Sequence, residues 1–222
     1  IAESIIFYLY ASSLFTTAYF QELNIERVDM EEYLCCLPSD KKFKRSEITF
    51  HGKRPEFKQN LIMIMPTILR TVDGFENFTY IVRTVNSIMA GAQDIHLIIL
   101  IGHTETEKKE FILNLLLGSF KNYIENGNIH IIELNKNDFI KPNYIFPNDF
   151  KDSDRRVLGR LTHNLHLAFL FEYSAGFSSH ILQLEDDIIA DTNYLEIIKS
   201  ILKACKNEVW THLKFSAYFG DI

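Results

Sequence analysis

Ile181-Leu-Gln-Leu-Glu-Asp-Asp-Ile-Ile189 is the stretch that decides the fold class. Its first four residues form a short apolar-leaning run, which is typical of a buried strand in a parallel sheet. Three consecutive carboxylates, Glu185, Asp186 and Asp187, stand where that strand ends. Because ligands of open α/β sheets bind beyond the carboxyl ends of the strands, the stretch predicts both a strand and a candidate site.

The same kind of pattern repeats on both sides of this stretch. Short apolar runs predict further strands at residues 61–65, 95–101, 129–134 and 210–216. Apolar residues at helical spacing predict helices at residues 77–90, 105–124, 154–173 and 193–205. Alternating strands and helices form a mostly parallel sheet that is covered on both faces. The sequence therefore predicts a Rossmann-type α/β fold.

The regular pattern defines a domain at residues 59–222. Residues 21–58 are polar, charged and weakly periodic, so they are expected to form a stem or linker. Within residues 1–20, an uncharged run is shorter than the roughly 20 residues of a membrane-spanning helix. Two interpretations of this segment stay open. It is either a signal-anchor remnant at a membrane or an apolar helix that docks on the domain.

Composition excludes several classes of protein. The chain of 222 residues has 23 Lys and Arg against 29 Asp and Glu, a net charge of −6, which disfavours a nucleic-acid binder. Its three cysteines are too few for a disulfide scaffold. No Gly-rich phosphate loop or Gly-x-Ser-x-Gly elbow is present in the sequence. Dinucleotide dehydrogenases, P-loop kinases and α/β-hydrolases are therefore disfavoured.

The three carboxylates at residues 185–187 carry the main chemical prediction. Adjacent carboxylates repel one another, and partial burial raises the cost of keeping them charged. Divalent cations such as Mg²⁺ or Mn²⁺ prefer oxygen ligands and bridge carboxylates to phosphates. The cluster therefore predicts a site for a metal and a diphosphate. The alternative is an acidic turn that caps the following helix.

Polar residues elsewhere are expected near this cluster. Pro66-Thr67 with Arg70 follows the strand at 61–65, and Gly102-His103 follows the strand at 95–101. Parallel strands place these ends at one edge of the sheet.

The predicted helix at 154–173 adds a polar stripe. Arg156, Arg160 and Asn164 are spaced i, i+4 and i+8 and share one side of it. The two guanidiniums suit a diphosphate or a uracil carbonyl, and the alternative is a polar surface stripe. Separately, Asn77-Phe78-Thr79 is an N-glycosylation acceptor pattern at a predicted helix start, which favours the secretory pathway.

These residues together resemble the N-acetylglucosaminyltransferase IV family, the alpha-1,3-mannosyl-glycoprotein 4-beta-N-acetylglucosaminyltransferases. The resemblance covers roughly residues 60–222. It rests on the run at 181–189 joined to the upstream helix. Weaker matches are Pro66-Thr67 with Arg70, Tyr80-Ile81 with Thr84 and Ser87, Ile101-Gly102 with Thr104-Glu105, and Phe215-Ser216.

The resemblance implies a GT-A-type glycosyltransferase of the Golgi membrane, type II and lumenal. It would transfer N-acetylglucosamine from UDP-GlcNAc to a mannose of an N-glycan, with inversion and with Mn²⁺ or another divalent cation. By the resemblance, Asp187 binds the metal, while Glu185 and Asp186 contact the ribose or the donor sugar. The uridine pocket and the donor contacts would come from Pro66, Thr67, Arg70, Arg160 and Asn164. The catalytic base is unassigned.

The family's catalytic domain continues beyond Phe215-Ser216, so the chain is expected to hold the donor half of a domain that is truncated at its C-terminus. Two other functions therefore stay open. One is a catalytically inactive or regulatory Golgi relative that lacks the acceptor half. The other is a metal-dependent phosphohydrolase or nucleotidyltransferase that uses the same carboxylates.

Overall fold

The structure is a computed structural model that describes residues 8–11, 48–55, 59–72, 75–91, 94–103, 105–134, 151–208, 210 and 212–214.

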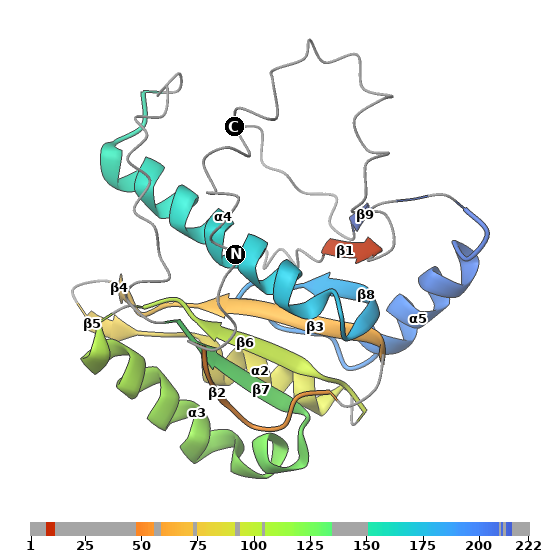
Figure 1. Cartoon of the computed structure of the whole chain (residues 1–222), viewed down its shortest axis with the longest axis horizontal. Helices are drawn as coiled ribbons and strands as arrows, with labels where there is room; N and C mark the ends of the chain where they lie inside the picture. Colours follow the sequence, from red (N-terminus) through yellow and green to blue (C-terminus); the bar gives the residue numbers. More distant parts are fainter. Residues whose placement is uncertain are drawn as a thin grey trace.

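A mixed sheet organises the described residues (Figure 1). Its order is β2-β7-β6-β3-β8-β1-β9. The strands are β1 (Tyr8–Ala11), β2 (Thr49–His51), β3 (Gln59–Thr67), β6 (Leu97–Ile101), β7 (Ile129–Glu133), β8 (Ser178–Gln183) and β9 (His212–Lys214). Pairing is parallel between β7 and β6, β6 and β3, and β3 and β8. Antiparallel pairs join β2 to β7, β1 to β8 and β1 to β9.

The four parallel strands have the Rossmann order. Counted along the chain from β3, they lie in the sheet as third, second, first and fourth. The direction of winding therefore reverses between β3 and β8. Such a switch point leaves a crevice at the carboxyl ends of the two strands, which is where ligands of this architecture bind.

Helices cover both faces of the sheet (Figure 1). One face is covered by α2 (Ile81–Ala90), α3 (Thr106–Asn126) and α5 (Tyr194–Ala204), and the other by α4 (Asp154–Ser174). A separate hairpin of β4 (Arg70–Val72) and β5 (Phe75–Phe78) follows β3. The predicted mostly parallel sheet with helices on both faces is confirmed.

The two-sided cover explains the sequence pattern. In β3, Met63 and Met65 face the core beneath α2 and α3, and Ile62 and Ile64 face the core beneath α4. All four are fully buried. Successive side chains of a strand point to opposite faces, so a strand with both faces covered becomes a continuous apolar run.

The segments before residue 59 differ from their prediction. Tyr8–Ala11 form β1 within the segment expected to be an apolar helix or anchor remnant, and Thr49–His51 form β2 within the expected stem. Both strands pair antiparallel along an edge of the parallel sheet. An uncovered strand edge exposes unpaired backbone groups, and these additions satisfy them. Among the described residues, no helix is long and apolar enough to cross a membrane.

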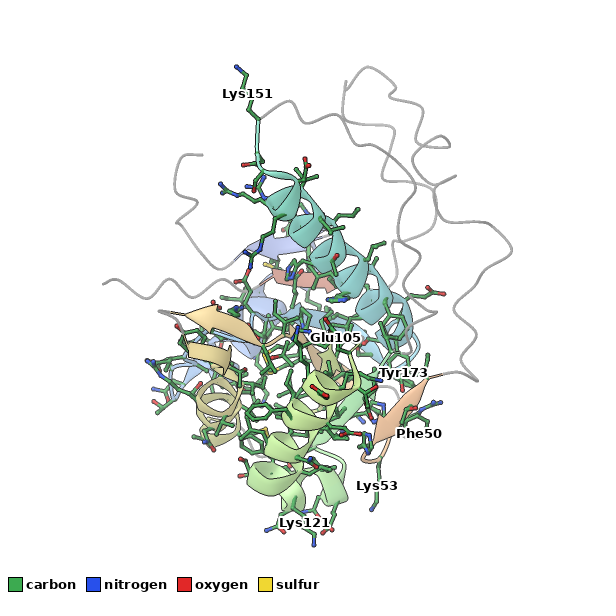
Figure 2. All side chains as sticks on the ribbon, turned by 90° about the vertical axis from the view of Figure 1, so that its left-hand side faces the viewer. Phe50, Lys53, Glu105, Lys121, Lys151 and Tyr173 are labelled. Atoms are coloured by element: carbon green, nitrogen blue, oxygen red, sulfur yellow. The ribbon has the colours of Figure 1, made fainter. Side chains whose placement is uncertain are left out.

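An aromatic stack ties β2 to helix α4. The Arg54 guanidinium lies 4.2 Å from the Phe50 ring centroid and 5.7 Å from that of Tyr173. Figure 2 shows Phe50 and Tyr173 on the same side of the molecule. A cation over two aromatic faces is stabilising, so this stack helps to hold the short edge strand in place.

Two further predictions concern the connections. The helix expected at 77–90 begins only at Ile81, because residues up to Phe78 pair within the β4–β5 hairpin. Asn77 therefore lies on β5 and not at a helix start, and its glycosylation stays a prediction. Residues 135–150, between β7 and α4, lie outside the described residues.

Candidate functional site

The carboxyl ends of β3 and β8 meet at the switch point. Parallel pairing brings Ile64 level with Gln183, and the Leu184 N–H donates to the Ile64 carbonyl over 2.9 Å. The acidic run beginning at Glu185 therefore leaves the sheet directly beside Thr67, the last residue of β3. Two segments 119 positions apart in the sequence share one crevice.

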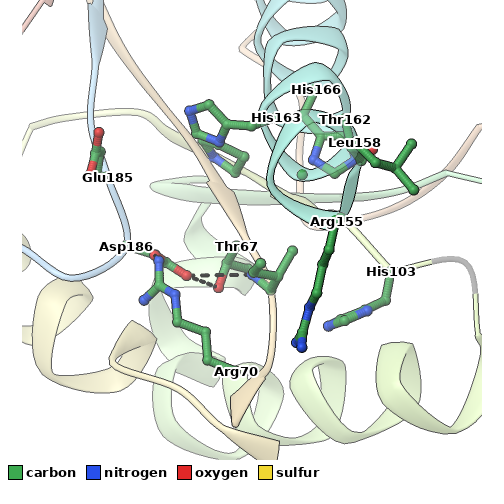
Figure 3. A pocket seen from close by; sticks show the side chains of 14 residues that line it. Thr67, Arg70, His103, Arg155, Leu158, Thr162, His163, His166, Glu185 and Asp186 are labelled. Carbon is green, nitrogen blue, oxygen red and sulfur yellow. Dashed lines mark hydrogen bonds and ion pairs between the residues drawn. The ribbon is translucent and has the colours of Figure 1, made fainter. Parts of the chain in front are cut away.

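Asp186 is held by the last residue of β3 and by residues that follow this strand (Figure 3). Its side chain is 3% exposed. The Thr67 hydroxyl donates to Oδ2 over 2.7 Å, and Arg70 Nη2 donates to Oδ1 over 2.5 Å. The Ile68 N–H lies 3.4 Å from Oδ2. A buried carboxylate is tolerated when charge and hydrogen bonds compensate it, so the chain itself neutralises Asp186.

This arrangement adds a cation of the chain itself to the site predicted from sequence. The three carboxylates were expected to be tolerated because a cation shares their pocket. The structure pairs Asp186 with Arg70, and the same guanidinium lies 3.6 Å from Asp187 Oδ2.

Helix α2 fixes the backbone of the acidic turn. The buried Thr84 hydroxyl lies 2.7 Å from the Asp186 carbonyl and 2.9 Å from the Ile188 carbonyl. The Ser87 hydroxyl accepts a hydrogen bond from the Ala190 N–H over 2.9 Å. Both residues had matched the family pattern in sequence, and the structure shows what they do. They hold the turn after β8 against the helix that follows β3.

Glu185 and Asp187 point into different surroundings. Glu185 lines the pocket, and burial, followed by the charge of Asp187, raises its pKa above the ordinary value. Asp187 is 41% exposed, and its Oδ2 lies 3.6 Å from Arg70 Nη1. Among the described residues, no three His, Cys, Asp or Glu side chains gather into a metal-binding group.

A pocket of about 380 Å³ opens between the strand ends and helix α4 (Figure 3). The strand ends contribute Pro66, Thr67, Ile68, Arg70, Gly102, His103, Glu185 and Asp186. Helix α4 contributes Arg155, Leu158, Gly159, Thr162, His163 and His166. The structure therefore brings together five of the residues predicted for the site, namely Pro66, Thr67, Arg70, Glu185 and Asp186.

Two predicted site residues on α4 lie elsewhere. Arg160 and Asn164 are exposed and do not line the pocket, and Arg160 Nη1 lies 2.6 Å from Asp152 Oδ2. The pocket-facing positions run 155, 159 and 163, one residue before the stripe 156, 160 and 164. One residue turns a helix by about 100°, so the expected stripe is rotated away from the crevice.

His166 and Gly102 set how closely α4 approaches the sheet. His166 is 2% exposed, and burial, followed by the nearby His163 and His103, lowers its pKa to about 4. A Cβ on Gly102 would lie 2.5 Å from His166 Cε1. Only glycine at this position leaves room for the imidazole. Sequence reasoning noted the Gly102-His103 strand end but assigned it no partner on α4.

Comparison with known proteins places these features in a family. The family model described as the MGAT4 conserved region matches residues 27–220. Alpha-1,3-mannosyl-glycoprotein 4-beta-N-acetylglucosaminyltransferase A is 29% identical in Bos taurus and in Mus musculus, each over 168 residues. The corresponding enzyme B of Danio rerio is 26% identical over 162 residues.

These alignments cover different shares of this chain and of its relatives. They include 71% of this chain but only 28–29% of each relative, so the chain spans less than a third of the length of the curated relatives it matches. No solved structure matches the chain at a significant level.

Proposed function

The chain belongs to the family of the MGAT4 conserved region, and from this premise we propose that it binds the donor in a GT-A-type glycosyltransferase reaction. The reaction is the transfer of N-acetylglucosamine from UDP-GlcNAc to a mannose of an N-glycan. We infer this reaction from the names of the relatives. The observation that carries the proposal is the buried Asp186, clasped by Thr67 and Arg70 beside a pocket at the switch point.

The pocket suits part of a nucleotide sugar. Its volume of about 380 Å³ falls within the range of small-ligand sites, roughly 300–1,000 Å³. Thr67 and Arg70 come from the strand end, and Glu185 offers a carboxylate that accepts hydrogen bonds from ribose or sugar hydroxyls. The clasp on Asp186 keeps these groups at fixed separations, and such preorganisation lowers the cost of binding.

A divalent cation such as Mn²⁺ fits the acidic turn. Asp187 is the most exposed of the three carboxylates, and its charge helps to raise the pKa of Glu185. The repulsion between Asp187 and Glu185 shows that the chain compensates their negative charge only in part. We therefore assign the metal to Asp187. A cation bound there would neutralise the donor diphosphate and stabilise the departing UDP. Arg70 would add positive charge beside it.

Inversion and compartment follow from the same proposal. The donor is α-linked, and the names of the relatives describe a 4-beta product, so the transfer inverts the anomeric carbon. N-glycan acceptors and the Asn77-Phe78-Thr79 pattern favour the lumenal side of the Golgi membrane, with the chain in type II orientation.

Calorimetry of the whole chain tests this function. UDP-GlcNAc is titrated with and without Mn²⁺ into the wild type, Asp187→Asn and Asp191→Asn. Asp191 is an exposed acid four positions further on, so its variant controls for lost charge. We expect metal-dependent binding that Asp187→Asn weakens roughly tenfold or more and Asp191→Asn leaves unchanged.

Two results would contradict the assignment. If the wild type does not bind UDP-GlcNAc, the donor site is wrong. If Asp187→Asn and Asp191→Asn bind UDP-GlcNAc equally well, the assignment of the metal to Asp187 is wrong. Binding without turnover on an N-glycan acceptor would favour the inactive relative of the same fold.

A further inference from the structure

His103 connects the end of β6 to the loop that follows β3. It lies two residues beyond Ile101, the last residue of β6, and its side chain is 13% exposed. The backbone N–H of Leu69 donates to His103 Nε2 over 2.7 Å. Next to it, the Gly102 N–H donates to the Thr67 carbonyl over 2.9 Å. The loop after β3 is therefore tied to β6 at two successive points.

The opposite side of this loop makes the clasp on Asp186. Thr67 and Ile68 reach Oδ2, Arg70 reaches Oδ1, and Leu69 lies between them with its N–H turned towards His103. The loop thus spans from β6 on one side to the end of β8 on the other. Thr67 is held by its pairing with Ile101 in the sheet, whereas Ile68 and Arg70 would be freer to move away from the carboxylate without the bond to His103.

The hydrogen-bond pattern fixes the tautomer of His103. A backbone N–H can only donate, so Nε2 must accept and the neutral ring carries its proton on Nδ1. Nδ1 lies 3.4 Å from Glu105 Oε2, a carboxylate whose negative charge favours a proton on this nitrogen. Protonation of the ring would place a second proton on Nε2, facing the Leu69 N–H. Two donors cannot form that bond.

We propose that His103 is a positioning residue, which holds the loop after β3 so that Ile68 and Arg70 keep their contacts with Asp186, and which releases the loop when its ring is protonated. The effect on the donor rests on the proposed function, whereas the tie to Leu69 stands without it. His103 makes no direct contact with Asp186 in this account and acts through the loop.

The charges around the ring decide when release occurs. Burial is the main cause that lowers the pKa of His103 below its ordinary value of 6.5, and Lys108 of α3 lowers it further, whereas Glu105 raises it. From α4, His166 is neutral near pH 7, and Arg155 lines the same pocket. The tie is therefore complete above pH 6.5 and is lost as the pH falls through the lowered pKa of the folded protein.

Amide exchange and donor binding on the full chain test the proposal together. His103→Leu removes the acceptor, whereas His103→Gln supplies an amide oxygen that accepts but does not titrate. We expect His103→Leu to speed Leu69 amide exchange about tenfold and to weaken UDP-GlcNAc binding by a similar factor. His103→Gln should recover most of both. As the pH falls below 6.5, binding by the wild type should weaken more steeply than binding by His103→Gln.

His180→Leu is the matched control. The His180 ring contacts the Asn60 carbonyl over 3.0 Å, near the opposite end of β3, so its loss should change neither measurement. The proposal is overturned if Leu69 stays protected in His103→Leu, if the Leu and Gln variants bind the donor equally weakly, or if the two pH profiles coincide. If the wild type binds no UDP-GlcNAc, the proposed function fails, and Leu69 exchange alone decides the role of His103.

Discussion

Two buried carboxylates lie at the carboxyl ends of parallel strands, and of the two Asp186 lines the pocket between the strand ends and α4. Asp186 follows β8 and is held by Thr67 and Arg70. Glu133 ends β7, with His51 Nε2 at 2.6 Å and Lys109 Nζ at 3.7 Å. The partners of Asp186 line the pocket, whereas the partners of Glu133 come from β2 and α3 and do not.

The difference shows what a buried ion pair means in this fold. Both clusters compensate a carboxylate that burial would otherwise penalise, so pairing alone identifies neither as functional. The position in the sheet separates them. β7 is paired on its outer side with the antiparallel β2, whereas β3 and β8 flank the switch point, where ligands of such sheets bind. We therefore regard the Glu133 cluster as a tie for the edge strand.

Removing each carboxylate should have the largest effect and tests this comparison directly. Asp186→Ala and Glu133→Ala each leave buried donors without their acceptor, and we expect each to lower the free energy of unfolding by about 3 kcal/mol. Donor affinity should separate them. Calorimetry should detect no UDP-GlcNAc binding by Asp186→Ala and near wild-type binding by folded Glu133→Ala. Similar donor affinities in the two variants would erase the distinction.

A glycine in each region offers a second, smaller test. A Cβ on Gly52 would lie 2.5 Å from the Ile129 carbonyl at a φ of +86°, and a Cβ on Gly102 would meet the His166 ring. We expect Gly52→Ala and Gly102→Ala each to cost about 2 kcal/mol of stability in denaturant titrations. Only Gly102→Ala should also weaken donor binding, because it pushes α4 away from the strand ends. A donor-binding defect confined to Gly52→Ala would contradict this assignment.

The smallest predicted effect concerns two arginines on α4. Arg155 lines the pocket and has no ion pair within the described part of the chain, whereas Arg160 is bound to Asp152 on the neighbouring side of the helix. Arg155→Gln should weaken UDP-GlcNAc binding about fivefold, and Arg160→Gln should leave it unchanged. Both residues are exposed, so we expect little change in thermal stability. A larger loss of affinity in Arg160→Gln than in Arg155→Gln would contradict this assignment and would support the stripe of Arg156, Arg160 and Asn164 expected from the sequence.

Much of the architecture could be read from local patterns. Continuous apolar runs predicted β3, β6, β7 and β8, and helical spacing predicted α3, α4 and α5 to within a few residues. Burial of a strand on two faces, or of a helix on one, leaves a periodic trace in neighbouring residues. β1 and β2 were not predicted, because a short strand added beside a parallel sheet is selected by the strands with which it pairs.

The sequence alone determined that carboxylates follow a buried strand, because the apolar run and the acidic turn are contiguous along the chain. Only the tertiary structure decided that Thr67 and Arg70 bind Asp186, and that Arg155 lines the pocket in place of Arg160. The partners of a buried charge lie more than 100 positions away, and the rotation of α4 about its axis depends on how His166 packs against Gly102. Neither relation is expressed in any short stretch of residues, since packing between distant elements sets both.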